Sequence, residues 1–412
     1  MISDLTRTLA LFAQRHLIGV PDQRGPLRRA LVERVRHAVY EEGMVDKRWL
    51  ASVRNHQANA TGKVRVSFGS VRSLMDNELT LGVRKYRIDP IVNWINEHSD
   101  RYAASVYFHP DEFKRYPADI VVIVKLFDIY TYEQVAALKS SGMRFVYDVV
   151  DNPEHFLPPR YYADSPKFMG MMDAIIASSP LHIQDLSAIP VHQELIEHPV
   201  INTRWSRPRR TSEAGPFRLI WQGYSHNIGD MGRIHPIVAR LREETGRDIR
   251  IVYHANHPDR VDGFVEHRSW NLSDWDKVLS EMDVGVVIKP NTHNQLRKPS
   301  NKVLSYMSAG LPVVCRPTAA DRLVLQDGVN GFIANTDEEW YAVLRKLVTD
   351  PELRETVAER ALRYAREQYS IGGIAARYET LFDRVLAARA QPPVAIAAAL
   401  SSPRNGKPAI AP

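Results

Sequence analysis

Cysteine is nearly absent from this sequence, and long apolar runs are missing altogether. The 412 residues include one cysteine, Cys315, which can form neither a disulfide within the chain nor a cysteine-based zinc site. No apolar run approaches the ~20 residues that a membrane-spanning helix needs. The first twenty residues lack the charged-then-apolar order of a signal peptide, because Asp4, Arg7, Arg15 and His16 interrupt them. We therefore expect a cytoplasmic protein.

The composition is that of an ordinary globular protein with a basic balance. Hydrophobic residues make up 44% and charged residues 25% of the chain, which excludes disorder over most of it. A chain of 412 residues exceeds what one hydrophobic core usually holds, so two domains are expected. The formal charge of +6 suits an anionic ligand or an anionic membrane surface, and we expect no nucleic-acid partner.

Hydrophobic periodicity divides the chain into five stretches. Residues 1–60 are predicted to form a helical, arginine-rich extension, and residues 389–412 a disordered tail rich in proline and alanine. Strand-length apolar runs alternate with helical segments over 61–204 and again over 217–388, with a polar linker at 205–216 between them. This alternation predicts an α/β protein with two doubly wound, mostly parallel sheets. Ligands bind at the carboxyl ends of such strands, so we expect the site in a cleft between the domains.

The strongest binding signal is a compact helix–glycine–strand unit. The stretch KPSNKVLSYMSAGLPVVC begins at Lys298, and its helix is predicted over 303–309, before Gly310. A helix start offers unpaired backbone N–H groups and the positive end of the helix dipole, and two lysines stand beside this one. Together these features predict a phosphate site built from Lys298, Ser300, Asn301 and Lys302.

Several segments resemble a known family. KPSNKVLSYMSAGLPVV, VLQDGVNGFIANTDEEW and LVTDPELRETVAERALRYAREQYS are similar to the C-terminal domain of nucleotide-sugar glycosyltransferases with the two-Rossmann GT-B fold, most closely the retaining family 4 group. DAIIASSP and ELIEHPVI resemble the end of that family's N-terminal domain. The resemblance implies an N-terminal acceptor domain, a C-terminal donor domain, and transfer of a sugar from a nucleotide-sugar co-substrate to a glycan, a lipid-linked acceptor or a small molecule, as in polysaccharide biosynthesis.

The resemblance also implies which residues form the site. In the family the helix start cradles the donor diphosphate, and the ends of neighbouring strands complete the donor site. The donor-binding residues carried over are Gly223, Lys289, Lys298, Ser300, Asn301, Lys302, Ser305, Thr318 and Asp321. The acceptor side comprises the catalytic candidates Asp148, Asp151 and His155, together with the loop residues Gly69 and Ser70. A plain turn at 151–153 and a tight strand-to-helix turn at Gly69 are the structural alternatives.

Two positions depart from the family pattern and leave the function open to alternatives. The family has two glutamates eight residues apart where this chain has Arg297 and Ser305. A serine can donate a hydrogen bond to a ribose hydroxyl, but it is too short to repeat a bidentate carboxylate grip. One alternative is a catalytically silent GT-B partner protein. The other is a nucleotide-sugar epimerase, which would need acid and base carboxylates in the cleft.

We expect neither a metal nor a further cofactor. The lysines and the helix start can neutralise a leaving diphosphate, and no pair of carboxylates of the DxD kind stands in a loop. His254 and His257 follow a strand without the other ligands of a zinc site. For the basic extension the hypothesis is reversible contact with the inner membrane face through Arg28, Arg29 and Arg36, and the alternative is packing on the N-terminal domain.

Overall fold

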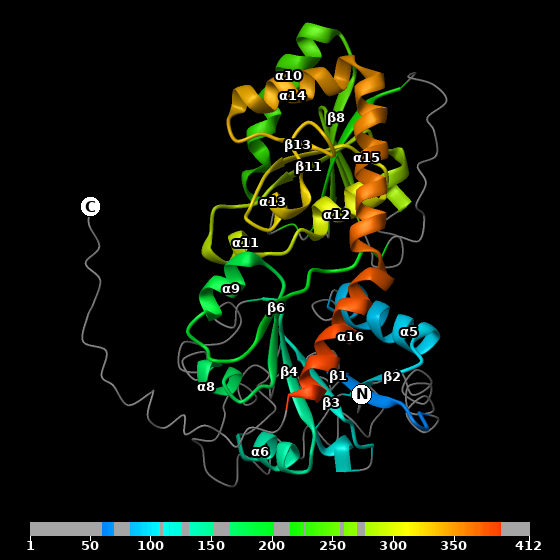
Figure 1. Cartoon of the computed structure of the whole chain (residues 1–412). Helices are drawn as coiled ribbons and strands as arrows, with labels where there is room; N and C mark the ends of the chain where they lie inside the picture. The colour runs from blue at the N-terminus through cyan, green and yellow to red at the C-terminus, as the bar shows by residue number, and fades with distance from the viewer. Residues whose placement is uncertain are drawn as a thin grey trace, which may run out of the picture.

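The structure is a computed structural model of the chain. It describes residues 60–69, 83–107, 110–114, 116–125, 132–151, 165–201, 215–223, 225, 228–255, 259–269 and 277–388. The predicted extension before Ala60, most of the predicted linker and the predicted tail lie outside these residues, as do Ser70 and His155. The described part has two lobes, each built around one sheet (Figure 1).

The N-terminal lobe contains a six-stranded parallel sheet in the order β2-β1-β3-β4-β5-β6. Apart from the edge strand β6, whose residues are only partly buried, its strands are largely buried on both faces, as is typical of parallel sheets. They are β1 (Val64–Gly69), β2 (Tyr102–Tyr107), β3 (Ile120–Val124), β4 (Arg144–Val149), β5 (Ala174–Ala177) and β6 (Gln193–Leu195). The helices of this lobe are α5 (Asp89–His98), preceded by the π-helical turn η2 (Arg84–Ile88), then α6 (Tyr132–Ser140), α8 (Ser165–Met169) and α9 (Pro180–Leu186), with the 3₁₀ turn η3 (Pro110–Lys114).

The C-terminal lobe contains a seven-stranded sheet in the order β13-β12-β11-β7-β8-β10-β9, parallel except for β9. Its strands are β7 (Phe217–Gly223), β8 (Ile249–Ala255), β9 (Arg260–Asp262), β10 (Val265–Ser269), β11 (Val284–Ile288), β12 (Val313–Arg316) and β13 (Phe332–Ile333). Its helices are α10 (Ile234–Thr245), α11 (His293–Arg297), α12 (Asn301–Ser308), α13 (Asp321–Val324), α14 (Asp337–Thr349), α15 (Pro351–Tyr369) and α16 (Ile371–Ala387), with the 3₁₀ turns η6 (Gly229–Arg233) and η7 (Lys277–Glu281).

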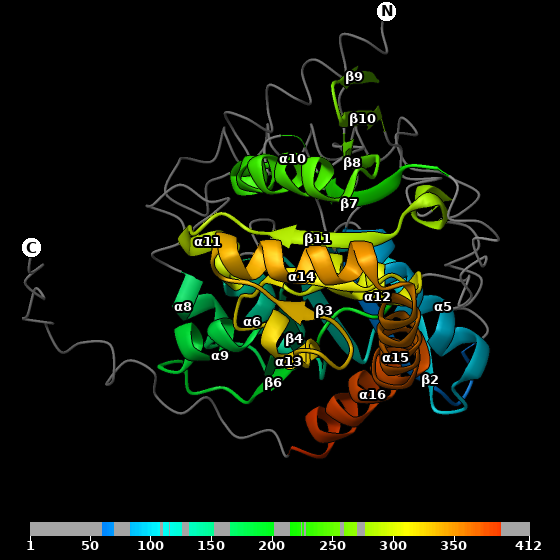
Figure 2. The ribbon, with the colours of Figure 1, turned by 90° about the horizontal axis from the view of Figure 1, so that it is seen from above.

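Helices cover both faces of the C-terminal sheet, as the views along two directions show (Figures 1 and 2). Alternate residues of β7 point to opposite sides. Leu219 packs with the helices α10 and α14, whereas Ile220 shares a core with α12 and α15. The predicted sequence of strands and helices is therefore present, and each sheet is doubly wound as expected.

Local capping signals set the ends of several helices. Thr336 and Glu339 form a capping box at the start of α14, and Asp350 caps α15 ahead of Pro351. Gly246 ends α10 with a φ of 66°, in the left-handed region that favours glycine. Each of these signals depends on contacts only three or four residues apart, so it can be read from the local sequence.

The last helix crosses from one lobe to the other. α16 follows the C-terminal lobe in sequence, yet it packs against α5 and the N-terminal sheet (Figure 1). Its Tyr378 and Phe382 rings contact Phe68 of β1, with centroid distances of 5.9 and 6.2 Å. This apolar contact ties the two lobes together on the side away from α11.

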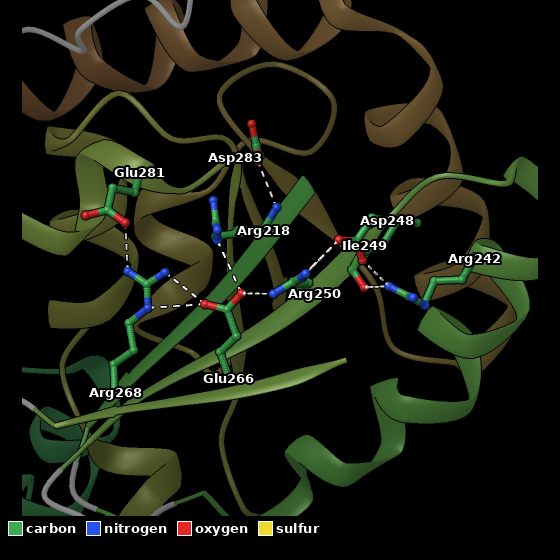
Figure 3. A network of polar contacts seen from close by, with 9 residues as sticks. All are labelled: Arg218, Arg242, Asp248, Ile249, Arg250, Glu266, Arg268, Glu281 and Asp283. Atoms are coloured by element: carbon green, nitrogen blue, oxygen red, sulfur yellow. Dashed lines mark hydrogen bonds and ion pairs between the residues drawn. The ribbon is translucent and has the colours of Figure 1, made fainter. Parts of the chain in front are cut away.

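A network of ion pairs crosses the amino ends of β7, β8 and β10 (Figure 3). Arg218 lies directly opposite Arg250 in the strand pair, a juxtaposition of like charges that is unfavourable by itself. The carboxylate of Glu266 reaches both arginines, at 3.5 and 3.1 Å, and also Arg268, at 2.8 Å. Burial would raise the pKa of Glu266, but hydrogen bonds from the arginines outweigh burial and hold that pKa below its usual range. The network stabilises the end of the sheet at which these strands begin, opposite their carboxyl ends.

Candidate active site

The chain order of the C-terminal sheet reverses between β7 and β11, which are hydrogen-bonded neighbours. Ligands of open α/β sheets bind at the carboxyl ends of strands at such a reversal. The residues at these two ends are Gly223 and Lys289, both predicted from the sequence. A Cβ atom at Gly223 would lie 3.2 Å from Cε of Lys302, so glycine leaves room for that lysine side chain beside the strand.

Three of the predicted donor residues bind one another. The Lys289 ammonium donates to both carboxylate oxygens of Asp321 at 2.9 Å, and both side chains are buried. The backbone N–H and the hydroxyl of Thr318 donate to the same carboxylate at 2.9 and 2.8 Å. The structure thus brings these residues together at the ends of β11 and β12. The charge of Lys289 is neutralised by Asp321, so it contributes little net attraction for an anion.

The start of α12 has polar groups without partners. Ser300 precedes the helix, but its side chain makes no cap hydrogen bond, and its Oγ is buried. The side-chain oxygen of Asn301 is also buried, and neither atom has a hydrogen-bond partner among the residues that the structure describes. Buried polar groups are normally satisfied, so these two mark a place where a ligand group or water completes the bonding. The backbone N–H groups of the helix start face the same need.

Lys302 is a cation with no counter-ion among the residues that the structure describes. Within the described part of the chain it makes no hydrogen bond or ion pair, and its Nζ lies 5.2 Å from the centre of the Trp221 ring. Burial, followed by repulsion from Lys289 and Lys298, lowers the pKa of Lys302 to about 8. An ammonium held this way gains strongly from an incoming anion. Of the predicted phosphate contacts, Lys302 is the one that an anion would neutralise.

A second cluster of charged residues joins the two lobes. Asp151, after β4, accepts from Nζ of Lys125 at 2.6 Å and from Nζ of Lys298 at 2.5 Å. Burial would raise the pKa of Asp151, but the charges of Lys298 and Lys125 outweigh burial and hold it well below the usual range. Beside this cluster, Arg297 binds Asp185 of α9, with Nη2 and Oδ1 2.7 Å apart. Adjacent residues of the C-terminal lobe therefore each hold an aspartate of the N-terminal lobe.

Asp148 lies deeper in the molecule than its predicted catalytic role would require. Its carboxylate is buried and accepts from Nε and Nη2 of Arg87, both at 2.8 Å, and from the hydroxyl of Tyr378 at 2.8 Å. These contacts use both oxygens and join α16 to the N-terminal sheet. What the structure assigns to Asp148 is a structural contact between the lobes, and its part in catalysis stays a prediction.

The predicted loop residue Gly69 has a packing explanation. A Cβ atom there would lie 2.1 Å from the ring of Tyr107, its partner in the β1–β2 register, so only glycine fits. Ser305 lies elsewhere, on the face of α12 toward the N-terminal lobe. It lines a small pocket whose other residues are Tyr86, Pro199, Val200, Ile201, Asn301, Leu304 and Ser308.

Lys125, Asp185 and His182 were not predicted from the sequence. Lys125 has a φ of 67°, the one positive φ of a residue other than glycine in the described part of the chain. Such backbone strain is concentrated at functional sites. His182 is buried with its Nε2 unpartnered among the described residues, and burial lowers its pKa to about 4. The signal that could have found Lys125 is its place at the carboxyl end of β3, beside the point where the N-terminal sheet reverses its strand order.

Residues 233–380 match the glycosyl transferase-like family, which covers most of the C-terminal lobe. This lobe thus resembles the glycosyl transferase-like family, and with its two doubly wound lobes the chain has the GT-B fold. None of the curated proteins matches it. Among the described helices, none has the length and apolar character needed to cross a bilayer, and no group of three or more candidate metal ligands occurs among the described residues.

Solved structures share the fold of this chain at low sequence identity. HepE from Anabaena, in complex with UDP and glucose, has a TM-score of 0.55 and 12% identity, over 78% of this chain and 99% of that one. Sucrose-phosphate synthase from Thermosynechococcus elongatus has a TM-score of 0.57 and 11% identity, over 79% and 100%. A glycosyltransferase from Rickettsia africae has a TM-score of 0.54 and 11% identity, over 79% and 100%. The predicted GT-B fold is thereby confirmed.

Proposed function

We propose that this glycosyltransferase takes its sugar from a nucleoside-diphosphate donor bound at the start of α12, and that UDP is the first nucleotide to test. The observation that carries the proposal is Lys302, an ammonium with no counter-ion among the described residues, which follows closely on Ser300, whose buried Oγ has no hydrogen-bond partner among them. The complex of the structurally similar HepE with UDP and glucose supports the choice of nucleotide.

The proposed chemistry follows from charge. Breaking the bond between sugar and diphosphate leaves negative charge on the leaving group, and donors already aimed at that charge lower the barrier. The Lys302 ammonium and the N–H groups at the start of α12 would supply this stabilisation without a metal. The acceptor binds from the N-terminal lobe, near Asp151, and is a glycan, a lipid-linked sugar or a small molecule. The proposed stereochemical outcome is retention, as the family resemblance implies.

Binding of nucleotides to the full chain tests the donor site. Isothermal titration with UDP, GDP and ADP should show one nucleotide bound per chain, and Lys302→Gln should weaken that binding. If none of the three binds the folded wild-type protein, the donor site is placed wrongly. Incubation with the corresponding nucleotide sugar and a panel of acceptors then measures transfer, and the anomeric configuration of the product tests retention.

A catalytically silent GT-B partner is the second candidate. It is favoured by the two positions that depart from the family: Arg297 is engaged with Asp185, and Ser305 is too short for a bidentate grip. The two candidates differ in a single-turnover experiment with a bound radiolabelled nucleotide sugar. An enzyme releases the nucleoside diphosphate and a glycosylated or hydrolysed sugar over time, whereas a silent protein returns the donor intact.

A further inference from the structure

The carboxylate of Asp151 lies between lysines from both lobes. Lys125 follows β3 of the N-terminal lobe, and Lys298 precedes α12 of the C-terminal lobe. The two ammonium groups contact different oxygens of the same carboxylate, at 2.6 and 2.5 Å. One negative charge therefore holds two positive charges, and it joins residues 147 positions apart in the sequence.

The same Lys298 stands four residues before Lys302, near enough for its charge to lower the pKa of that lysine. Lys302 has no counter-ion within the described residues, whereas Lys298 already has one. An anion arriving at the start of α12 would thus meet one available lysine and one engaged lysine. The Lys298 side chain is 31% exposed and the Asp151 side chain 9%, so the lysine is the partner with room to move.

We propose that Asp151 binds Lys298 where a donor phosphate would otherwise bind it, and that donor binding transfers Lys298 from the carboxylate to the diphosphate. This inference rests on the proposed function. In the structure the Asp151–Lys298 pair joins the two lobes. When a diphosphate takes Lys298, the carboxylate keeps Lys125 as its partner and faces the acceptor side of the cleft. Asp151 is then a positioning residue whose charge opposes donor binding.

The proposal predicts that removing the charge of Asp151 tightens UDP binding. Asp151→Asn removes the competing charge, so UDP should bind about fivefold or more tightly than to the wild type, as the coupling between close charge pairs suggests. A residue that only supports the local structure would weaken binding or leave it unchanged. Asp185→Asn is the matched control, because it removes an equal charge from the same lobe and frees the neighbouring Arg297. We expect the control to change UDP affinity by less than about twofold.

A second pair of variants keeps the wild-type carboxylate and does not depend on the folding of Asp151→Asn. Lys298 exchanges one anion for another on binding, whereas Lys302 gains a counter-ion that it lacked. Lys298→Gln should therefore weaken UDP binding less than Lys302→Gln does. In the Asp151→Asn variant, Lys298 has no carboxylate to give up, so its contact with the diphosphate contributes fully to UDP affinity. Lys298→Gln should therefore weaken UDP binding more in that variant than in the wild type.

Titration calorimetry with UDP, and with GDP and ADP in parallel, measures all of these variants on the full chain. Tighter binding by Asp151→Asn but not by Asp185→Asn supports the exchange. If Lys302→Gln weakens binding while Asp151→Asn does not tighten it, or Lys298→Gln costs as much as Lys302→Gln, the exchange is wrong and the donor site stands. If no nucleotide binds either the wild type or Asp151→Asn, the donor site and the exchange both fail.

Discussion

Lys302→Gln is the most direct test of the donor site, because replacing this lysine disrupts no ion pair among the described residues. Its ammonium makes no ion pair with the described residues, so removing it leaves no buried carboxylate unpaired. The lost interaction is a charge-assisted hydrogen bond to a phosphate, which contributes about 1.5–3 kcal/mol. Its loss should weaken nucleotide binding roughly 10- to 150-fold. The protein itself should fold as the wild type does.

The pH dependence of binding tests the same lysine without a mutation. Burial and the neighbouring lysines lower the pKa of Lys302 to about 8 in the unliganded protein, and a bound diphosphate raises it again. Binding therefore takes up a proton at pH values near 8 and above. At pH 9 only about one Lys302 in ten carries its proton, so UDP affinity should fall roughly tenfold between pH 7 and pH 9.

Titration calorimetry in buffers of different ionisation enthalpy measures both the affinity and the proton uptake. Wild-type protein should show proton uptake near pH 8, and Lys302→Gln should show a flatter affinity profile with little uptake. Lys346→Gln removes an equal charge from the exposed surface of α14 and serves as the control. A wild-type profile as flat as that of Lys302→Gln would refute the assignment of the phosphate contact.

Three further predictions concern stability at low pH, the ion-pair network around Glu266, and the need for a metal. The folded pKa of His182 is lowered to about 4, so the unfolded chain binds the proton more readily. This group therefore costs about 2 kcal/mol of stability when the pH falls from 7.5 to 5, and urea unfolding of His182→Asn should show a smaller loss. Glu266→Gln should lower the free energy of unfolding by about 1–2 kcal/mol, and the effect should fade below the unfolded pKa of a glutamate because the folded pKa is depressed. Transfer activity should survive EDTA, and a complete loss restored by Mg²⁺ would contradict charge neutralisation by lysine and helix alone.

Features that depend on neighbours in the sequence could be predicted. The capping box of α14 and the glycine that ends α10 are encoded within a few residues, and the alternation of strands and helices gave both sheets. The strand β9 could not be predicted, because it has three exposed residues and no alternating burial. The start of α12 was expected at 303 and lies at Asn301, a shift that includes Lys302 in the first turn.

Contacts across the cleft could not be predicted, because no local pattern links residues from separate lobes. Asp151 was expected at the acceptor side, but nothing in its own segment indicates that its partner is Lys298. Arg297 appeared only as a departure from the family, and its partner Asp185 gave no signal at all. Likewise, the apolar residues along one face of α16 indicate that this face is buried, but they do not indicate that it packs on the other lobe.

The departure at Ser305 and the unpaired state of Lys302 are connected by helix geometry. Residues three apart on a helix are neighbours, so a carboxylate at position 305 would lie within reach of the ammonium of Lys302. The first turn of α12 has no acidic residue, and Ser305 brings no charge. Lys302 is therefore left for a ligand anion, and Lys289, the other lysine at the ends of these strands, is already neutralised by Asp321. Under the proposed function, the donor site has a more positive net charge without the family's carboxylates, and Asp151 of the facing lobe balances part of that charge through its contact with Lys298.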